Sequence, residues 1–131
     1  MPLFVFEGVN PKKLGVLPCE AEEAIASFKK YLQEQVALNP ILKVQPKDVA
    51  VTVIKEYAVG DNQDVIIKVY CDRKDERTKE VLDGVGKDAI KVFVSRFPAQ
   101  ERVSAFVFPI DKEVGRADFQ KEKNEEVEME T

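Results

Sequence analysis

The second residue of the chain is a proline, and its position makes it the leading candidate for acid–base chemistry. An initiator methionine is normally removed when proline follows it, and Pro2 then carries a free secondary amine at the start of an apolar strand. Because the chain contains no histidine, this amine is one of few groups that could exchange a proton near neutral pH. An inert Met-Pro start is the alternative, since such starts are common.

The composition excludes several other kinds of site. Without histidine there is no Ser-His-Asp or Cys-His arrangement, and no zinc site that uses histidine. The two cysteines, Cys19 and Cys71, cannot form a structural zinc site on their own. We expect them to be free thiols in a cytoplasmic protein. The sequence therefore predicts neither a metal nor a cofactor.

The net charge of -4 lies entirely in the last residues. Residues 117–131 contain six acidic residues and two lysines, whereas residues 1–116 contain 18 basic and 18 acidic residues. A neutral domain makes nucleic acid a poor partner, and no apolar run is long enough to cross a membrane. We predict one domain over residues 1–116, followed by an acidic, flexible tail over residues 117–131.

Hydrophobic periodicity and turn residues predict four strands and two helices. Apolar runs and alternation favour the strands, while apolar residues at three- and four-residue steps favour the helices. Asp72 is the predicted N-cap of the second helix, and Pro109 is expected to end the last strand. The predicted order is a strand at Leu3–Glu7, a helix from Pro18 to Asn39, strands at Val49–Tyr57 and Asp64–Cys71, a helix from Asp72 to about Phe97, and a strand at Val103–Phe108.

This β-α-β-β-α-β order predicts an α+β fold made of two βαβ units. Parallel strands within each unit and a pseudo-twofold axis between the units give a four-stranded sheet with both helices on one face. Because both faces of the strands are apolar, we expect the uncovered face to meet another subunit. Gly84 and Gly86 in the second helix mark either close packing against a neighbour or no packing role.

Four short segments together resemble one protein family. They are Met1-Pro2 before the first strand, Pro46-Lys47-Asp48-Val49 before the second, Tyr70-Cys71-Asp72-Arg73 after the third, and Phe106-Val107-Phe108-Pro109-Ile110 at the end of the fourth. This set is similar to an uncharacterised bacterial branch of the tautomerase (macrophage migration inhibitory factor-like) superfamily. The chain departs from that branch at Val114–Phe119, where the branch commonly has a Gly-x-His-Phe segment.

The resemblance implies a fold, an assembly and an activity. Members of the superfamily assemble as trimers and use an N-terminal proline as the catalytic base. For this chain it implies a homotrimeric isomerase in which Pro2 moves a proton during keto–enol exchange in a small 2-oxo acid. Lys47 matches a position where members often carry a basic residue, so it is a candidate for substrate binding.

The predicted topology places further candidates beside Pro2. If a twofold axis relates the two units, the start of the first strand lies beside the end of the third, which brings Pro2 near Cys71 and Arg73. Arg73 and the N-terminus of the second helix could hold a substrate carboxylate or an enolate oxygen. A nearby cation also favours the neutral form of an amine, which a general base needs. The apolar wall of the site is predicted from Phe4, Tyr70 and Phe108.

Two other functions are compatible with the same sequence. A non-catalytic oligomeric domain could keep this fold with Pro2 inert. A ferredoxin-like module that binds a small ligand, and is dimeric, could have the same order of strands and helices.

Overall fold

The computed structural model describes residues 2–56, 64–100 and 102–110, and within these ranges it confirms the predicted order of helices and strands. The predicted tail and the predicted turn at residues 60–62 lie outside the described residues. Short 3-10 turns at η1 (Pro11–Lys13), η2 (Pro18–Glu20) and η3 (Pro46–Asp48) lie between the main elements. The main elements are β1 (Leu3–Val9), α1 (Ala21–Ala37), β2 (Ala50–Lys55), β3 (Val65–Asp72), α2 (Lys79–Arg96) and β4 (Val103–Ile110).

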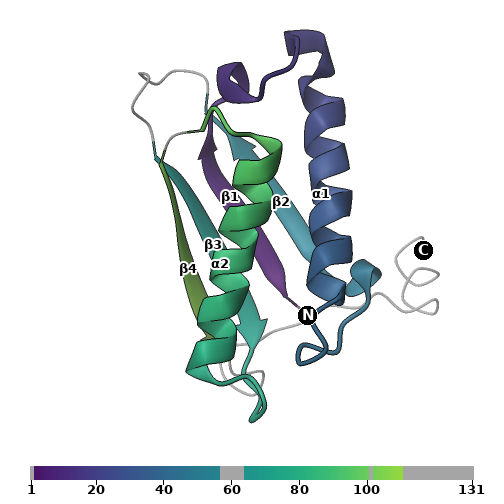
Figure 1. Ribbon diagram of the computed structural model, residues 1–131, viewed down its shortest axis with the longest axis vertical. Coiled ribbons are helices and arrows are strands. Elements are labelled where there is room, and N and C mark those ends of the chain that lie inside the picture. The colour runs from purple at the N-terminus through teal and green to yellow at the C-terminus, as the bar shows by residue number, and fades with distance from the viewer. Residues whose placement is uncertain (1, 57–63, 101, 111–131) are drawn as a thin grey trace, which may run out of the picture.

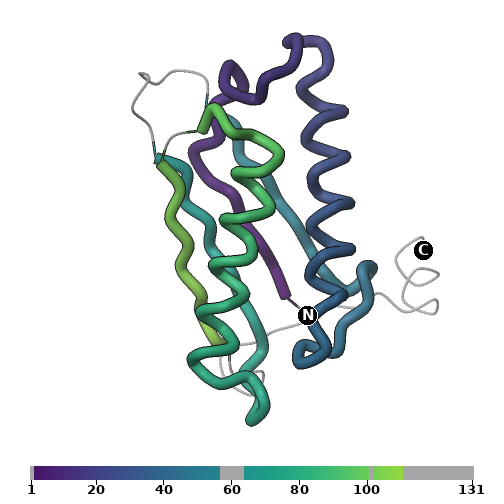
Figure 2. The backbone as a smooth tube through the Cα atoms, in the orientation of Figure 1, coloured from purple at the N-terminus to yellow at the C-terminus, as the bar shows by residue number. Residues whose placement is uncertain are grey.

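The strands form one mixed sheet in the order β2-β1-β3-β4. β1 pairs in parallel with β2, β3 pairs in parallel with β4, and β1 and β3 pair antiparallel at the centre. Both helices cover the same face of the sheet (Figures 1 and 2). This confirms the predicted α+β fold of two βαβ units. The ferredoxin-like alternative does not fit, because that fold inserts another strand into its βαβ units, whereas both parallel pairs here are directly hydrogen-bonded.

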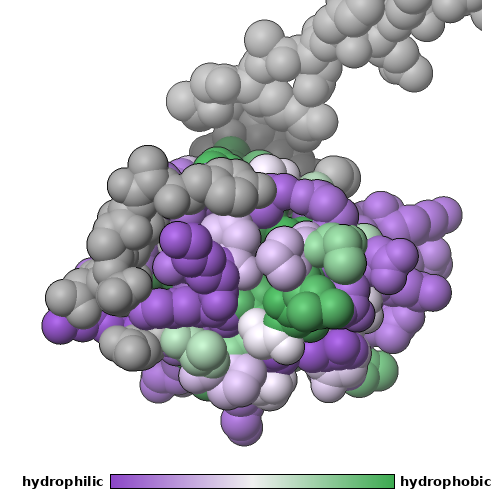
Figure 3. Space-filling model, turned by 90° about the horizontal axis from the view of Figure 1, so that it is seen from above, coloured by the Kyte–Doolittle hydropathy of each residue, from purple (hydrophilic) through white to green (hydrophobic). Residues whose placement is uncertain are grey.

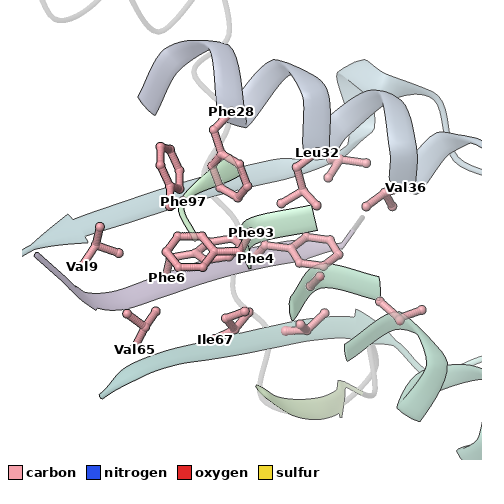
Figure 4. Close-up of a cluster of buried hydrophobic side chains, with 14 of the residues drawn as sticks. Phe4, Phe6, Val9, Phe28, Leu32, Val36, Val65, Ile67, Phe93 and Phe97 are labelled. Carbon is pink, nitrogen blue, oxygen red and sulfur yellow. The ribbon is translucent and has the colours of Figure 1, made fainter. Parts of the chain in front are cut away.

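An aromatic core fills the space between the sheet and the helices. Phe6 on β1, Phe28 on α1 and Phe93 on α2 have no exposed surface. Their ring centroids lie 5.1 to 5.5 Å apart in edge-on and stacked pairs (Figure 4), which are the arrangements that aromatic pairs prefer. The predicted apolar stripe of α1 is the face that reaches this core, and its buried residues are Ala21, Ile25, Phe28, Leu32 and Val36.

The two glycines of α2 differ in their surroundings. A Cβ atom at Gly86 would lie 3.1 Å from Cγ2 of Val107 on β4, whereas a Cβ at Gly84 would meet nothing within 4 Å. Gly86 therefore lets α2 approach β4 closely, and Gly84 has no such role. The sequence could not distinguish these two glycines, because the difference depends on which side of the helix faces the strand.

We expect Gly84→Ala to stabilise the fold by up to about 1 kcal/mol, because alanine is the better helix former. Gly86→Ala gains the same helix propensity but crowds a β-branched side chain, so it should be less stable than Gly84→Ala by about 1–3 kcal/mol. Urea unfolding of the two variants at equal chain concentration measures the difference. Equal unfolding midpoints would contradict the close approach of α2 to β4.

β1 and β4 continue two residues beyond their predicted ends. β1 continues through Gly8, whose φ of 77° is a backbone angle that glycine adopts readily. The pairing of β1 with β2 shifts register between Phe6 and Val9. β4 continues through Pro109 to Ile110, so the prediction that Pro109 ends this strand is wrong. A proline lacks the N–H that a central strand needs, but β4 lies at the edge of the sheet, where this loss is tolerated.

The predicted start of the second helix is also wrong. Asp72 is the last residue of β3 and not an N-cap, and α2 begins at Lys79. Thr78 is the N-cap, and its side chain accepts a hydrogen bond from the backbone N–H of Val81 at 3.3 Å. The turn from Arg73 to Arg77 therefore separates the end of β3 from the helix.

The opposite face of the sheet carries no helix and is mainly apolar, with an ion pair between Lys68 on β3 and Glu7 on β1 at 3.2 Å. Alternate residues of β4 point away from α2, and Phe106 and Phe108 are 53% and 42% exposed. Tyr70 on β3 stacks on Phe108 with ring centroids 5.3 Å apart, and Leu3 on β1 pairs with Tyr70 in the ladder. We call this surface the open sheet face. Its apolar character fits the prediction that it meets another subunit.

Candidate active site

Pro2 lies buried directly before the start of β1. Its side chain is among those less than 2% exposed, and its carbonyl oxygen accepts a hydrogen bond from the backbone N–H of Ala50 at 3.0 Å. Leu3 pairs with Tyr70 in the antiparallel ladder, so Pro2 continues that ladder opposite Cys71. The structure thus brings Pro2 between the start of β2 and the end of β3, as the predicted topology requires.

A buried arginine, Arg77, lies at the same end of the sheet. Its guanidinium donates from Nη1 to the carbonyl oxygen of Asp72 at 2.9 Å and from Nη2 to that of Leu42 at 3.0 Å. Arg77 is 5% exposed, and its Nε has no hydrogen-bond partner among the described residues. The two bonds join the end of β3 to the segment after α1, so the cation is held in a fixed position.

Cys71 lies next to this cation and is fully buried. Burial raises the pKa of the Cys71 thiol, and the positive charge of Arg77 opposes that rise. The thiol is therefore neutral near pH 7 and acts as a small apolar group of the core. A nucleophilic role would require the thiolate, which this environment disfavours.

The raised pKa of Cys71 predicts a pH dependence of stability. Below the ordinary thiol pKa of about 8.5, both the folded and unfolded chains keep the proton. Above it, the unfolded chain loses the proton more easily, so the free energy of unfolding falls as the pH rises toward the folded pKa. Urea midpoints at about pH 7 and pH 9.5 should show a smaller fall in Cys71→Ala than in the wild type. The exposed thiol of Cys19 supplies the control, and Cys19→Ala should keep the full fall.

Arg73 lies on the surface next to this cluster. Its backbone N–H donates to the carbonyl oxygen of Ile110 at 2.7 Å, which extends the β3–β4 ladder. Its side chain is exposed and lines a hollow of about 350 Å³ together with Arg77 and five other residues. Arg73 is therefore a surface cation beside a buried one.

The other predicted binding residues lie apart from this cluster. Lys47 is exposed on η3. Tyr70 and Phe108 stack on the open sheet face, whereas the ring of Phe4 has no exposed surface and belongs to the core on the helix side. Within one chain these residues do not form a wall around Pro2. As substrate-binding residues, Lys47, Tyr70 and Phe108 stay predictions.

Solved structures with the same architecture were found at low sequence identity. A protein of unknown function from Vibrio cholerae has a TM-score of 0.60 at 10% identity, over 89% of this chain and 84% of that chain. Macrophage migration inhibitory factor from Oncomelania hupensis has a TM-score of 0.58 at 16% identity, over 84% and 73% of the two chains. A fused 4-OT protein, a symmetric trimer, has a TM-score of 0.56 at 14% identity, over 84% and 86%.

The likeness covers 84–89% of this chain. This chain has the tautomerase fold. No family model matches its sequence, and the search of curated proteins gave no match. The likeness to the tautomerase fold therefore lies in the arrangement of helices and strands, which confirms the fold expected from the Met1-Pro2 start and the other short segments.

The sequence analysis missed one member of the cluster in this tautomerase-fold chain. Arg77 lies in the charged run Asp72-Arg73-Lys74-Asp75-Glu76-Arg77, which is typical of a solvated turn. The available signal was its position just before the helix N-cap Thr78, but a pattern of charges does not reveal which one faces inward. Among the described residues, no group of three or more metal-ligating side chains occurs, and no helix is long and apolar enough to cross a membrane.

The end of the molecule that carries the β1–α1 connection lies opposite the start of β1 (Figure 1). From above, mostly hydrophilic side chains surround a small apolar area there (Figure 3). Val16 and Leu17 of the β1–α1 connection are exposed. The buried cation and the buried thiol lie at the other end of the sheet, which is where the candidate site belongs.

Proposed function

We propose that this protein is a tautomerase that moves a proton in a small 2-oxo acid by keto–enol exchange. The observation that carries the proposal is the position of Pro2, at the buried end of β1 and at the same end of the sheet as the fixed cation of Arg77. We propose that Met1 is removed and that the freed nitrogen of Pro2 is the base. Apolar surroundings and a nearby cation both favour the neutral amine that can accept a proton.

The remaining roles follow from charge and position. Arg73 binds the substrate carboxylate through a charge-assisted hydrogen bond. The fixed charge of Arg77 stabilises negative charge that develops on the enolate oxygen, since a preorganised cation in a poorly solvated site needs no rearrangement during the reaction. Lys47, Tyr70 and Phe108 reach substrate only from a neighbouring subunit or along the open sheet face, and their part in binding rests on trimer formation.

We further propose that three chains assemble through the open sheet face and that the protein is cytoplasmic. The exposed aromatic residues of β4 support an interface, because large apolar side chains gather on that face without a covering helix. The symmetric trimer formed by the fused 4-OT protein supports the number three. The free thiols of Cys19 and Cys71 support a reducing compartment.

Sedimentation or light scattering should give three times the 14.8 kDa of one chain. Phe106→Lys places a charge at the centre of the proposed interface and should shift the population to monomers, because an unpaired charge is costly to bury. Leu38→Lys changes an exposed apolar residue outside the open sheet face and should leave the trimer intact. A dimer, or a trimer that tolerates Phe106→Lys, would contradict the proposed assembly.

One observation favours a non-catalytic function instead. The side chain of Pro2 is fully buried, as expected of an inert residue that only anchors the end of β1. The mass of the purified protein separates the two functions, because a retained Met1 makes the Pro2 nitrogen an amide that cannot accept a proton. Loss of Met1 together with proton exchange on 2-oxobutanoate supports the enzyme, and retention of Met1 supports an oligomeric domain without this chemistry.

A further inference from the structure

A hollow at the N-terminus of α2 gathers three cations around an apolar floor. It has a volume of about 350 Å³ and lies between the first turns of α2 and the end of β4. This size is within the range of small-molecule sites. Its lining comprises the cations Arg73, Arg77 and Lys79, the acid Asp83, and the apolar residues Leu82, Val107 and Pro109.

The lining of this hollow carries more positive than negative charge. Lys79 is the first residue of α2, where the positive end of the helix dipole disfavours a cation. Arg73 and Arg77 add two like charges to the lining, and a single acid, Asp83, lines the same hollow. A hollow lined by three cations and one acid favours an anionic ligand, because its net charge is positive.

The buried arginine supplies independent support for a ligand. Arg77 is 5% exposed, its Nη1 and Nη2 donate to backbone carbonyls, and its Nε has no hydrogen-bond partner among the described residues. None of the ion pairs of the described residues compensates this charge with a carboxylate. A buried charge without a carboxylate partner is costly, and the negative charge of an anion in the hollow that Arg77 lines would offset that cost.

We propose that this hollow binds the oxyanion of a small apolar molecule, a phosphate or a carboxylate, with Arg73 and Lys79 as direct contacts and Arg77 as a fixed charge behind them. Leu82, Val107 and Pro109 contact the apolar body of the ligand. The backbone N–H groups in the first turn of α2, which lack partners within the helix, add donors for the anion. Asp83 disfavours ligands with a second negative charge at the far side.

This inference shares Arg73 with the proposed function but does not depend on proton transfer. Pro2 is not among the residues that line the hollow. The hollow lies on the helix side of the sheet, because Val107 is the residue that contacts Gly86 of α2. Assembly through the open sheet face therefore leaves it accessible.

Titration of the 15N-labelled full chain with phenyl phosphate, benzoate and inorganic phosphate tests the proposal. We expect saturable shifts of the backbone amides between Arg77 and Leu82, with phenyl phosphate or benzoate binding about tenfold more tightly than inorganic phosphate, because the ring buries apolar area. The tighter of the two aromatic ligands identifies the preferred oxyanion. Equal affinity for bare phosphate and both aromatic ligands would overturn the role of the apolar floor.

Two matched double variants distinguish specific binding in the hollow from nonspecific electrostatic attraction of the anion. Arg73→Gln with Lys79→Gln should raise the Kd of the tighter aromatic ligand by about a hundredfold or more, since each of the two lost charge-assisted hydrogen bonds is worth at least about tenfold. Lys87→Gln with Lys91→Gln removes the same charge from exposed positions of α2 and should leave the Kd within about twofold. Equal weakening by both pairs, or no saturable shift in the wild type, would overturn the proposal.

The Pro2→Ala variant distinguishes this inference from the proposed enzyme. It should bind the aromatic oxyanion with an unchanged Kd even though its proton exchange is expected to be lost. Binding without exchange in the wild-type protein would remove the proposed enzyme and keep the anion site. Proton exchange without binding in the hollow would keep the proposed enzyme and remove the anion site.

Discussion

Pro2→Ala should slow proton exchange on 2-oxobutanoate by about 10²–10⁴-fold, the usual contribution of a positioned general base. The variant still allows removal of Met1 but replaces a ring-held secondary amine by a mobile primary amine. The rigid ring fixes φ, so alanine loses both the orientation and the surroundings of the base. Exchange is measured as the loss of the C3 proton signal of the substrate in D2O.

Two controls make this result specific to the Pro2 nitrogen. Pro18→Ala replaces an exposed proline at the start of η2, near the other end of the sheet, and should keep the wild-type rate. A chain extended before Pro2, in which the nitrogen remains an amide, should be as slow as Pro2→Ala or slower. If Pro2→Ala exchanges as fast as the wild type, proton transfer by Pro2 is excluded and the non-catalytic domain becomes the better interpretation.

Phe93→Ala should cause the largest loss of stability, about 3–5 kcal/mol in the free energy of unfolding. Phe93 has no exposed surface, and its ring lies 5.3 Å from that of Phe6, 5.5 Å from that of Phe28 and 5.3 Å from that of Phe97. Its removal leaves a cavity where both helices meet the central strand β1. The two βαβ units share this cluster, so the loss affects the fold as a whole.

The neighbouring residue provides the control for this variant. Val94→Ala lies on the same helix but is exposed, and should cost no more than about 0.5 kcal/mol. Urea unfolding is followed at one fixed chain concentration, because assembly would make the apparent stability depend on concentration. A loss below about 1.5 kcal/mol in Phe93→Ala would mean that the ring cluster packs less tightly than Figure 4 shows.

The residues of the proposed site differ in how far the sequence alone can identify them. Pro2 is visible at once, because few residue types can act as a base in a chain without histidine. Arg73 follows from the antiparallel placement of β1 against β3, which the repeated βαβ pattern predicts. The burial of Arg77 cannot be predicted from the sequence. A run of six charged residues is typical of an exposed turn, and the pattern does not show which side chain is buried.

The helices and strands also show which features the sequence predicts and which depend on tertiary contacts. The apolar stripe of α1 predicted its buried face, since helical spacing depends only on local geometry. The start of α2 was misplaced because both Asp72 and Thr78 can serve as N-caps, and only the pairing of Asp72 with Ile110 in the sheet excludes the first. The prediction for Pro109 was wrong for a related reason. A strand can continue through a proline where it lies at the edge of the sheet, and the sequence does not show that β4 is an edge strand.

The sequence by itself determined the α+β class, the order of the strands and helices, and the position of Pro2 at the start of β1. These depend on periodicities and turn residues, which act over a few neighbouring positions. Tertiary structure alone decided that Arg77 is buried, that a Cβ atom would crowd β4 at Gly86 and meet nothing at Gly84, and that Tyr70 and Phe108 stack on the open sheet face. Each of these outcomes depends on contacts between residues far apart in the chain, and no local pattern encodes which of two similar residues will make them.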